Sequence, residues 1–344
     1  MIDNNLLIKG DNIKGMQWLL DNGYEGQIDL VYIDPPFATG GVFATDNDGR
    51  VATISKSSDS KIAYSDTLQG KEFIEFLRER ALFIRRLLSE QGSLYLHIDY
   101  KIGHYVKVML DEVFGIDCFR NDITRIKCNP KNFDRVGYGN IKDMILFYTK
   151  GKQPIWHHPR FECSPEEVAK LYSKVDKHGR RYTTVPIHAP GETKNGESSR
   201  PFKGIYPPKG RHWRCSVEEL EQLDADGLIE WSANGNPRKI NYADDHMTKK
   251  AQDIWEFKDP TYPMYPTEKN LDMLKFIVGA SSNEGSIVMD CFCGSGSTLY
   301  AASQCNRRWI GIDQSEIAIE TVRKRFPKSD LFVSPSENYE FLEV

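Results

Sequence analysis

Residues 286–298 read SIVMDCFCGSGST, and this stretch decides the fold. The apolar run that ends at Asp290 is typical of a buried strand, and helix signals follow the second glycine. A glycine-rich turn between a strand and a helix lets a ligand approach the backbone and aims the amides of the helix N-terminus at it. The stretch therefore predicts a strand, a ligand-binding turn and a helix in direct succession.

The next strand signal narrows the kind of ligand. Residues 309–313 read WIGID and end in Asp313, whose carboxylate can accept hydrogen bonds from both hydroxyls of a ribose. A dinucleotide fingerprint needs a third glycine where this chain has Leu299, and the chain lacks the Gly-Lys-Ser/Thr of a P-loop. The pattern favours a cofactor that carries a nucleoside, with a glycine turn that only packs helix on strand as the alternative.

A second motif closes the strand signal at residues 28–33, where Asp34, Pro35, Pro36 and Phe37 follow directly. Two successive prolines remove two amide donors and fix φ, so the backbone carbonyls are held as unpaired acceptors. The Asp34 carboxylate adds a third acceptor, and the Phe37 ring offers a stacking surface for a planar heterocycle. The motif predicts a socket for an amino group on an aromatic base, with a plain strand-to-turn junction as the alternative.

Strand and helix signals alternate on both sides of a middle zone, which predicts a parallel α/β sheet covered on both faces and split by an insertion. The polar stretch 38–66 predicts a mobile loop that orders over a bound ligand. The expected strands are 28–34, 92–98, 122–127, 144–149, 287–291 and 309–313; the expected helices are 71–89, 104–113, 270–280, 297–304 and 315–325.

The middle zone, residues 151–260, shows little periodicity and should be mostly loop around a small core of its own. One helix is expected at 217–223, capped by Ser216 with Glu219 in the capping-box position. Residues 120–215 contain 20 Lys or Arg against 9 Asp or Glu, within a chain of net charge −4. This local excess predicts a polyanion partner, with a solvated basic face as the alternative.

Composition excludes several classes of protein. With 344 residues, 40% hydrophobic and 27% charged, the chain is neither disordered nor fibrous, and no apolar run is long enough to span a membrane. The start carries no secretory signal, so a cytoplasmic protein is expected. Seven cysteines without a CxxC pair indicate reduced thiols. His157 and His158 lack further ligands at fixed spacing, and no metal site is expected.

Together, the Asp-Pro-Pro-Phe motif and the DCFCGSGST turn resemble the amino-methylating DNA methyltransferases that use S-adenosylmethionine. Their order, with the basic insertion between them, is similar to the β subgroup, as in the modification subunits of type III restriction systems. The resemblance implies a Rossmann-like sheet, mostly parallel with one antiparallel strand. It also implies a catalytic half at 1–150, a target-recognition insertion at 151–260 and a cofactor-binding half at 261–344. Further matching blocks are residues 10–12, 32–40, 143–150, 211–214, 265–270 and 308–315.

What the resemblance implies can be assigned residue by residue. The catalytic residues are Asp34, Pro35, Pro36 and Phe37. S-adenosylmethionine contacts are expected from Asp11, Asp34, Thr267, Lys269, Asp290, Phe292, Gly294, Gly296, Thr298 and Asp313. DNA contacts are expected from Arg180, Arg181, Lys194, Arg200, Lys203, Arg211 and Arg214.

The implied reaction is methyl transfer to the exocyclic N6 of an adenine flipped out of double-stranded DNA. Within the resemblance, Asp before Pro-Pro accompanies adenine, and Ser accompanies N4 of cytosine. Cytosine N4 methylation and a DNA-binding modification subunit that needs a partner for activity are the alternatives. A homodimer and a restriction subunit are further partners that the resemblance leaves open. A nucleotide-dependent oxidoreductase is disfavoured by Leu299.

Overall fold

The computed structural model describes residues 4–36, 42–45, 51–52, 61–65, 70–130, 134, 136–193, 196–243, 247–259, 269–326 and 338–344, with backbone alone for the three short ranges between 42 and 65. The chain divides into two compact units. The first unit combines Met1–Pro159 with Gln252–Val344, and the second is Arg160–Ala251. The insertion therefore interrupts one sheet-based unit and forms the other.

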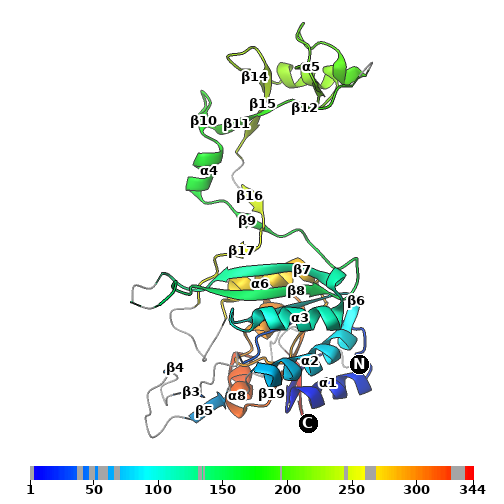
Figure 1. The fold of residues 1–344 in the computed structure, drawn as a ribbon, viewed down its shortest axis with the longest axis vertical. Coiled ribbons are helices and arrows are strands. Elements are labelled where there is room, and N and C mark those ends of the chain that lie inside the picture. Colours follow the sequence, from blue (N-terminus) through cyan, green and yellow to red (C-terminus); the bar gives the residue numbers. More distant parts are fainter. Residues whose placement is uncertain are drawn as a thin grey trace. The chain divides into compact units, whose positions relative to one another are not determined.

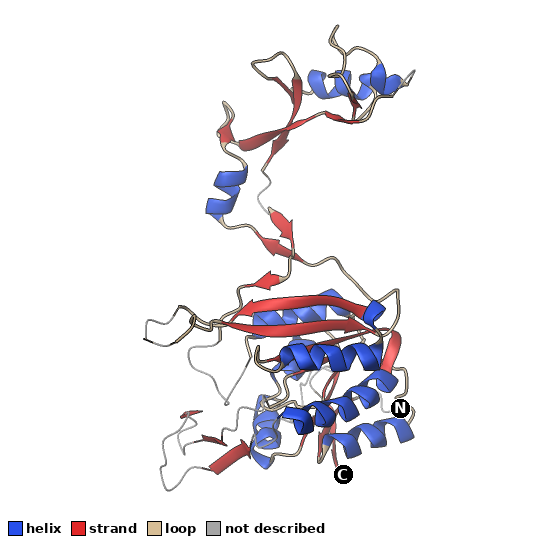
Figure 2. Cartoon of the chain, viewed as in Figure 1, coloured by secondary structure: helices blue, strands red, loops and turns tan. Residues whose placement is uncertain are grey.

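A nine-stranded sheet organises the first unit (Figures 1 and 2). All neighbouring pairs are parallel except those of β8, which runs antiparallel to β6 and β7. This confirms the predicted mostly parallel α/β sheet with one antiparallel strand. In order across the sheet, the strands are β17 (Ile254–Trp255), β7 (Phe119–Ile126), β8 (Lys142–Thr149), β6 (Leu88–Ile98), β2 (Ile28–Ile33), β18 (Ile287–Asp290), β19 (Arg308–Asp313), β1 (Asn5–Lys9) and β20 (Tyr339–Glu343).

Helices pack in two groups against this sheet (Figure 2). One group is α1, α2 and α3, and its apolar stripes form a core with the strands. In α2 the buried Phe73, Leu77, Ala81 and Ile84 recur at helical spacing and face that core. The second group contains α6 and α7. The helices are α1 (Asn12–Asp21), α2 (Gly70–Leu87), α3 (Gly103–Phe114), α6 (Leu271–Ser281), α7 (Ser297–Gln304) and α8 (Glu316–Arg325), with the 3-10 turn η1 (Ile116–Cys118).

The second unit has its own core of Ile187, Phe202, Trp213, Val217 and Leu220. The small core and the helix capped by Ser216 are confirmed, and between its loops the unit also contains short antiparallel strands and a second helix that the sequence analysis did not predict. Its elements are β9 (Arg160–Glu162), α4 (Pro165–Leu171), β10 (Lys174–Val175), β11 (Arg181–Pro186), β12 (His188–Pro190), η2 (Glu197–Ser199), β13 (Arg211–Trp213), α5 (Val217–Ala225), β14 (Ile229–Trp231), β15 (Pro237–Tyr242) and β16 (Thr248–Lys250).

Helix α4 went unpredicted although its start is readable in the sequence. The Ser164 hydroxyl accepts from the Glu167 amide, and the Glu167 carboxylate accepts from the Ser164 amide. This is the same reciprocal cap that Ser216 and Glu219 form on α5. Proline at the first helical position strengthens the signal.

Much of the predicted loop 38–66 lies outside the described residues. Within it, the backbone forms a small antiparallel sheet of β4 (Val51–Ala52), β3 (Val42–Thr45) and β5 (Lys61–Ser65). The seven cysteines are free thiols. A search of the described residues finds no helix with the length and apolar character needed to cross a membrane.

Candidate active site

The two motif strands lie side by side in the sheet. Leu30 of β2 pairs with Val288 of β18 in parallel register, so Asp34 and Asp290 leave the sheet at the same edge. From this pair the chain runs outward in opposite directions, from β2 to β6 and from β18 to β19. Such a reversal of strand order is where ligands bind in open α/β sheets. The two loops therefore open at one shared edge.

Within the described residues, the Asp34 carboxylate is held through one of its two oxygens. Lys269, which precedes α6, places its Nζ 2.5 Å from Asp34 Oδ2. Both side chains are largely buried, with 11% of Lys269 and 16% of Asp34 exposed. The second carboxylate oxygen, Oδ1, is buried and accepts no hydrogen bond within the described part of the chain. Because a buried carboxylate oxygen without a donor is costly, this atom is a ready acceptor for an incoming N–H.

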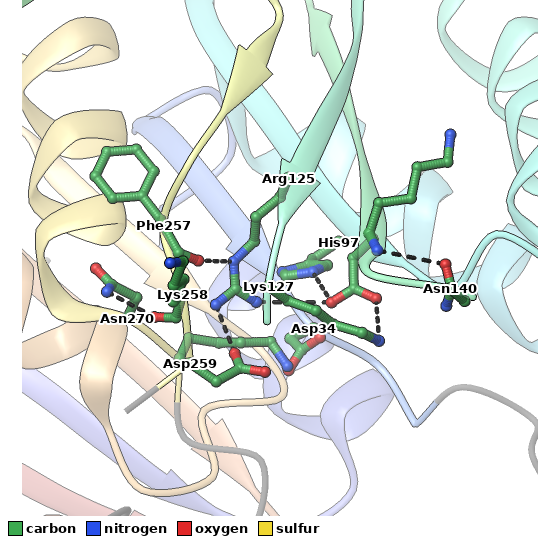
Figure 3. Close-up of polar contacts among 12 residues, drawn as sticks. Asp34, His97, Arg125, Lys127, Asn140, Phe257, Lys258, Asp259 and Asn270 are labelled. Atoms are coloured by element: carbon green, nitrogen blue, oxygen red, sulfur yellow. Dashed lines mark hydrogen bonds and ion pairs between the residues drawn. The ribbon is translucent and has the colours of Figure 1, made fainter. Parts of the chain in front are cut away.

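A row of buried polar side chains continues from Asp34 across the sheet edge (Figure 3). The Tyr32 hydroxyl lies 2.8 Å from His97 Nδ1, and His97 Nε2 lies 3.2 Å from Asp143 Oδ2. Lys127 Nζ donates to Asp143 Oδ1 at 2.6 Å, and Arg125 Nη1 lies 3.6 Å from Asp143 Oδ2. These residues belong to β2, β6, β8 and the end of β7, so the row links four adjacent strands beside Asp34.

Arg125 extends the row to the segment after β17. Its Nε donates to the Phe257 carbonyl at 2.8 Å, and its Nη2 donates to Asp259 Oδ1 at 2.5 Å (Figure 3). Arg125 is fully buried, which a guanidinium tolerates only with such partners. The sequence analysis missed this network. The available signal was an isolated His97 or Arg125 within an otherwise apolar or β-rich run.

Burial sets the charge states of the row. Burial lowers the pKa of His97 despite its hydrogen bond with Asp143, so the imidazole is neutral near pH 7. Burial also raises the pKa of Tyr32 well above its usual value. For Asp143, burial alone would raise the pKa, but the hydrogen bonds from His97 and Lys127 and the charge of Lys127 outweigh it and lower the pKa. The row therefore carries a buried carboxylate balanced by Arg125 and Lys127.

The glycine turn after β18 is built around two carboxylates. Asp290 Oδ1 accepts from the Phe292 amide at 3.0 Å. Asp313 uses both oxygens, accepting from the Gly294 amide at 2.9 Å and the Ser315 amide at 2.8 Å. The predicted ribose acceptor thus also orders the turn.

Gly296 opens α7 in the left-handed region at φ 76°, and an added Cβ would lie 2.9 Å from Val322. Glycine is required there on both counts.

Burial raises the pKa of Asp290 to about 7, because it outweighs the hydrogen bonds from Thr298 and the Phe292 amide. Its folded-state pKa lies above the ordinary carboxyl value of 3.8. The protonated form therefore stabilises the fold fully below about pH 4, and this contribution is lost as the pH rises through about 7.

Asp290→Asn should remove this pH dependence. Between pH 4 and 7, we expect the wild-type free energy of unfolding to fall relative to that of the variant, by on the order of 4 kcal/mol. Urea unfolding at a series of pH values measures the difference. Parallel curves for the two proteins across this range would contradict the assignment.

Asp11 and its neighbours lie beside the glycine turn, after the end of β1. Asp11 caps α1 through bonds from the Ile13 and Lys14 amides, and its Oδ2 lies 3.6 Å from Arg80 Nη2. Asn12 donates to the Cys291 carbonyl at 3.2 Å, next to Asp290. The structure thus gives Asp11 a capping role beside the glycine turn.

Three predicted site residues, Phe37, Thr267 and Lys194, lie outside the described residues. Among the described ones, Pro35 and Pro36 follow Asp34 at the sheet edge. His157 binds Asn283, with its Nε2 2.8 Å from Asn283 Oδ1.

The predicted DNA-contacting residues that the structure describes in the second unit are exposed and fall into two groups. Arg180, Arg200 and Lys203 form ion pairs with Asp176, Glu218 and Asp224 respectively. Arg181, Arg211 and Arg214 pair with no carboxylate within the described residues. Arg181 instead donates to the Tyr172 carbonyl at 3.4 Å.

Arg211 and Arg214 converge on His188, which the sequence analysis missed. Arg211 Nη1 lies 3.1 Å from His188 Nδ1, and Arg214 Nε donates to the His188 carbonyl at 3.3 Å. Burial is the main cause that lowers the pKa of His188. The positive charges of Arg211, Arg214 and Arg238 lower this pKa further. His188, Arg211, Arg214 and Arg238 are called the arginine cluster below.

Known proteins match this chain over most of its length. A sequence family described as DNA methylase matches residues 28–324. The type II methyltransferase M.EcaI of Enterobacter cloacae is 43% identical over 94% of this chain and 69% of its own length. The StyLTI Mod subunit, a type III restriction-modification enzyme of Salmonella typhimurium, is 25% identical over 88% of this chain and 50% of its own length.

Among solved structures, TTHA0409 of Thermus thermophilus, described as a putative DNA modification methylase and complexed with S-adenosyl-L-methionine, is 14% identical. The match covers 98% of both chains with a TM-score of 0.49. The chain spans about half the length of the type III Mod subunit and about two thirds of M.EcaI.

Proposed function

Because the chain belongs to the N6/N4 DNA methylase family, we propose that it transfers a methyl group from S-adenosylmethionine to the N6 amino group of adenine in double-stranded DNA. The observation that carries the proposal is the buried Asp34 Oδ1, which accepts no hydrogen bond from the described residues and lies beside the glycine turn at the reversal point of the sheet. An acceptor for an amino group and a turn suited to a nucleoside thus open at the same edge.

The residues at this edge fit the methyl donor. Gly294 and Gly296 keep the turn free of side chains, and Asp290 and Asp313 bring carboxylate oxygens to it. With Asp11, Lys269, Phe292 and Thr298 they form the proposed donor site, to which Thr267 is assigned from the sequence. When bound, S-adenosylmethionine supplies an electrophilic methyl group on a positively charged sulfur.

Asp34 orients the acceptor amine. Its Oδ1 accepts one amino hydrogen, and the carbonyls fixed by Pro35 and Pro36 accept the other. These bonds direct the nitrogen lone pair away from the acceptors and stabilise the positive charge that develops on nitrogen during transfer. Lys269 holds the other carboxylate oxygen in place. Phe37 is proposed as the stacking surface for the flipped base.

The second unit is proposed as the target-recognition region, with the arginine cluster as its main contact to DNA phosphates. Arg211→Ala and Arg214→Ala should each weaken binding to duplex DNA and make the slope of log affinity against log salt less negative by about 0.9. Fluorescence anisotropy at several salt concentrations measures this. Lys203→Ala is the matched control, because its ammonium is paired with Asp224. Equal losses in all three variants would overturn this assignment.

The reaction itself is tested with labelled S-adenosylmethionine and unmethylated DNA of mixed sequence, followed by mapping of the modified positions. We expect label on adenine N6 at one sequence. Label on cytosine N4 would replace the base assignment, and absence of any transfer would overturn the proposed activity of this chain.

A further inference from the structure

The connection between β7 and β8 carries two large apolar side chains in full solvent. Val136 and Tyr138 are the most exposed of the large apolar residues in the described part of the chain, and Tyr138 is 97% exposed. Gly137, between them, has φ 106°, and nothing lies within 4 Å of a Cβ added there. These two apolar side chains are therefore free to contact a bound partner.

The root of this connection is fixed. The Lys127 amide donates to the Ile141 carbonyl at 2.9 Å, which closes the hairpin. The Asp259 amide donates to the Lys127 carbonyl at 2.8 Å, and the Lys127 ammonium binds Asp143 (Figure 3). Tyr138 is thus carried on a hairpin whose base belongs to the polar row beside Asp34.

This hairpin leaves the sheet at the edge that carries Asp34. β7 runs parallel to β6 and β2 in direction, since β8 lies antiparallel between β7 and β6. Three strand spacings separate Asp34 from the hairpin root, roughly 14 Å. The hairpin root and Asp34 therefore lie near one another along the same edge of the sheet, so both can face a duplex bound there.

We propose that Tyr138 enters the base stack of the DNA and fills the space that the flipped target base leaves. The inference rests on the proposed function, because a paired amine must leave the duplex before it can reach Asp34. Unstacking is the cost of that step, and an inserted side chain offsets it by restoring contact with the neighbouring bases. A tyrosine ring offers a sequence-tolerant stacking face for this task.

The test uses short duplexes that contain the mapped methylation site, with the target base either paired or opposite an abasic position. Tyr138→Ala should lower kcat/KM about 10- to 100-fold on the paired duplex. On the abasic duplex, whose target base is already unpaired, the variant should return close to the wild-type value. Tyr138→Trp should remain active on both. Ile116→Ala is the matched control, because Ile116 is an exposed apolar residue before the opposite end of β7.

The two duplexes separate a role of Tyr138 in base flipping from a general defect. Wild-type rates for Tyr138→Ala on the paired duplex would overturn the inference and leave the proposed function intact. An equal loss on both duplexes would also overturn it, since a general defect would then explain the result. If the wild-type protein methylates neither duplex nor mixed-sequence DNA, the proposed function fails, and the inference fails with it.

Discussion

Asp34→Asn is expected to lower the rate of methyl transfer about 1,000-fold. The amide cannot supply the negative charge that stabilises the developing positive charge on the acceptor nitrogen, and one of its two terminal groups donates where an acceptor is required. Single-turnover transfer of labelled methyl groups to site-containing DNA measures the effect. Binding of S-adenosylmethionine by calorimetry should be retained in part, because the glycine turn is unchanged.

The same strand supplies a matched control. Asp29 of β2 lies at the opposite sheet edge, where its carboxylate accepts from Ser89 at 2.7 Å and from Ser286 at 2.6 Å. Asp29→Asn should leave the transfer rate near that of the wild type. If Asp34→Asn turned over like Asp29→Asn, Asp34 would have no role in catalysis, and the acceptor socket would have to lie elsewhere.

The ion pair of Asp34 explains why two distant parts of the sequence form one site. Lys269 belongs to the part of the chain that returns after the second unit, whereas Asp34 closes β2. The sequence analysis assigned Lys269 a contact with the cofactor, because the resemblance to the family was the only basis for giving it a role. In the structure its ammonium fixes one oxygen of Asp34 and leaves the other available, so it also orients the acceptor group.

The sheet was predictable because its strands are short apolar runs and its helices have apolar stripes. The capped helix α5 was equally predictable, since Ser216 and Glu219 act within one turn. The strands of the second unit were not predictable, because strands as short as β10 and β14 contain too few residues to show an alternation of apolar and polar side chains. Their pairing depends on a core that Phe202 and Trp213 form with residues distant in the sequence.

In the candidate site, too, residues within a local motif were predictable and residues that meet only in the fold were not. Asp34 and Asp290 were found because each follows a strand in a motif of adjacent residues. His97, Asp143 and Arg125 were missed because they come from three strands and become partners only through sheet register. Local sequence carries no record of such cross-strand partners.

The buried row also predicts the largest change in stability. Asp143→Ala should lower the free energy of unfolding by about 3–5 kcal/mol, because Arg125 and Lys127 would then lose the carboxylate that balances them. Asp143→Asn should cost less, since its amide oxygen still accepts hydrogen bonds. Urea unfolding followed by tryptophan fluorescence at pH 7 measures both variants.

The control for this experiment is an exposed ion pair of similar geometry. Glu112 lies 2.5 Å from Arg78 Nη1 with over half of its side chain exposed, so Glu112→Ala should cost less than about 1 kcal/mol.

The pH dependence provides a second check. Because the pKa of Asp143 is lowered in the fold, its contribution is present above the ordinary carboxyl pKa and is lost as the pH falls. The difference between the wild type and Asp143→Asn should therefore shrink in acid, and a constant difference would mean that the carboxylate charge does not stabilise the row.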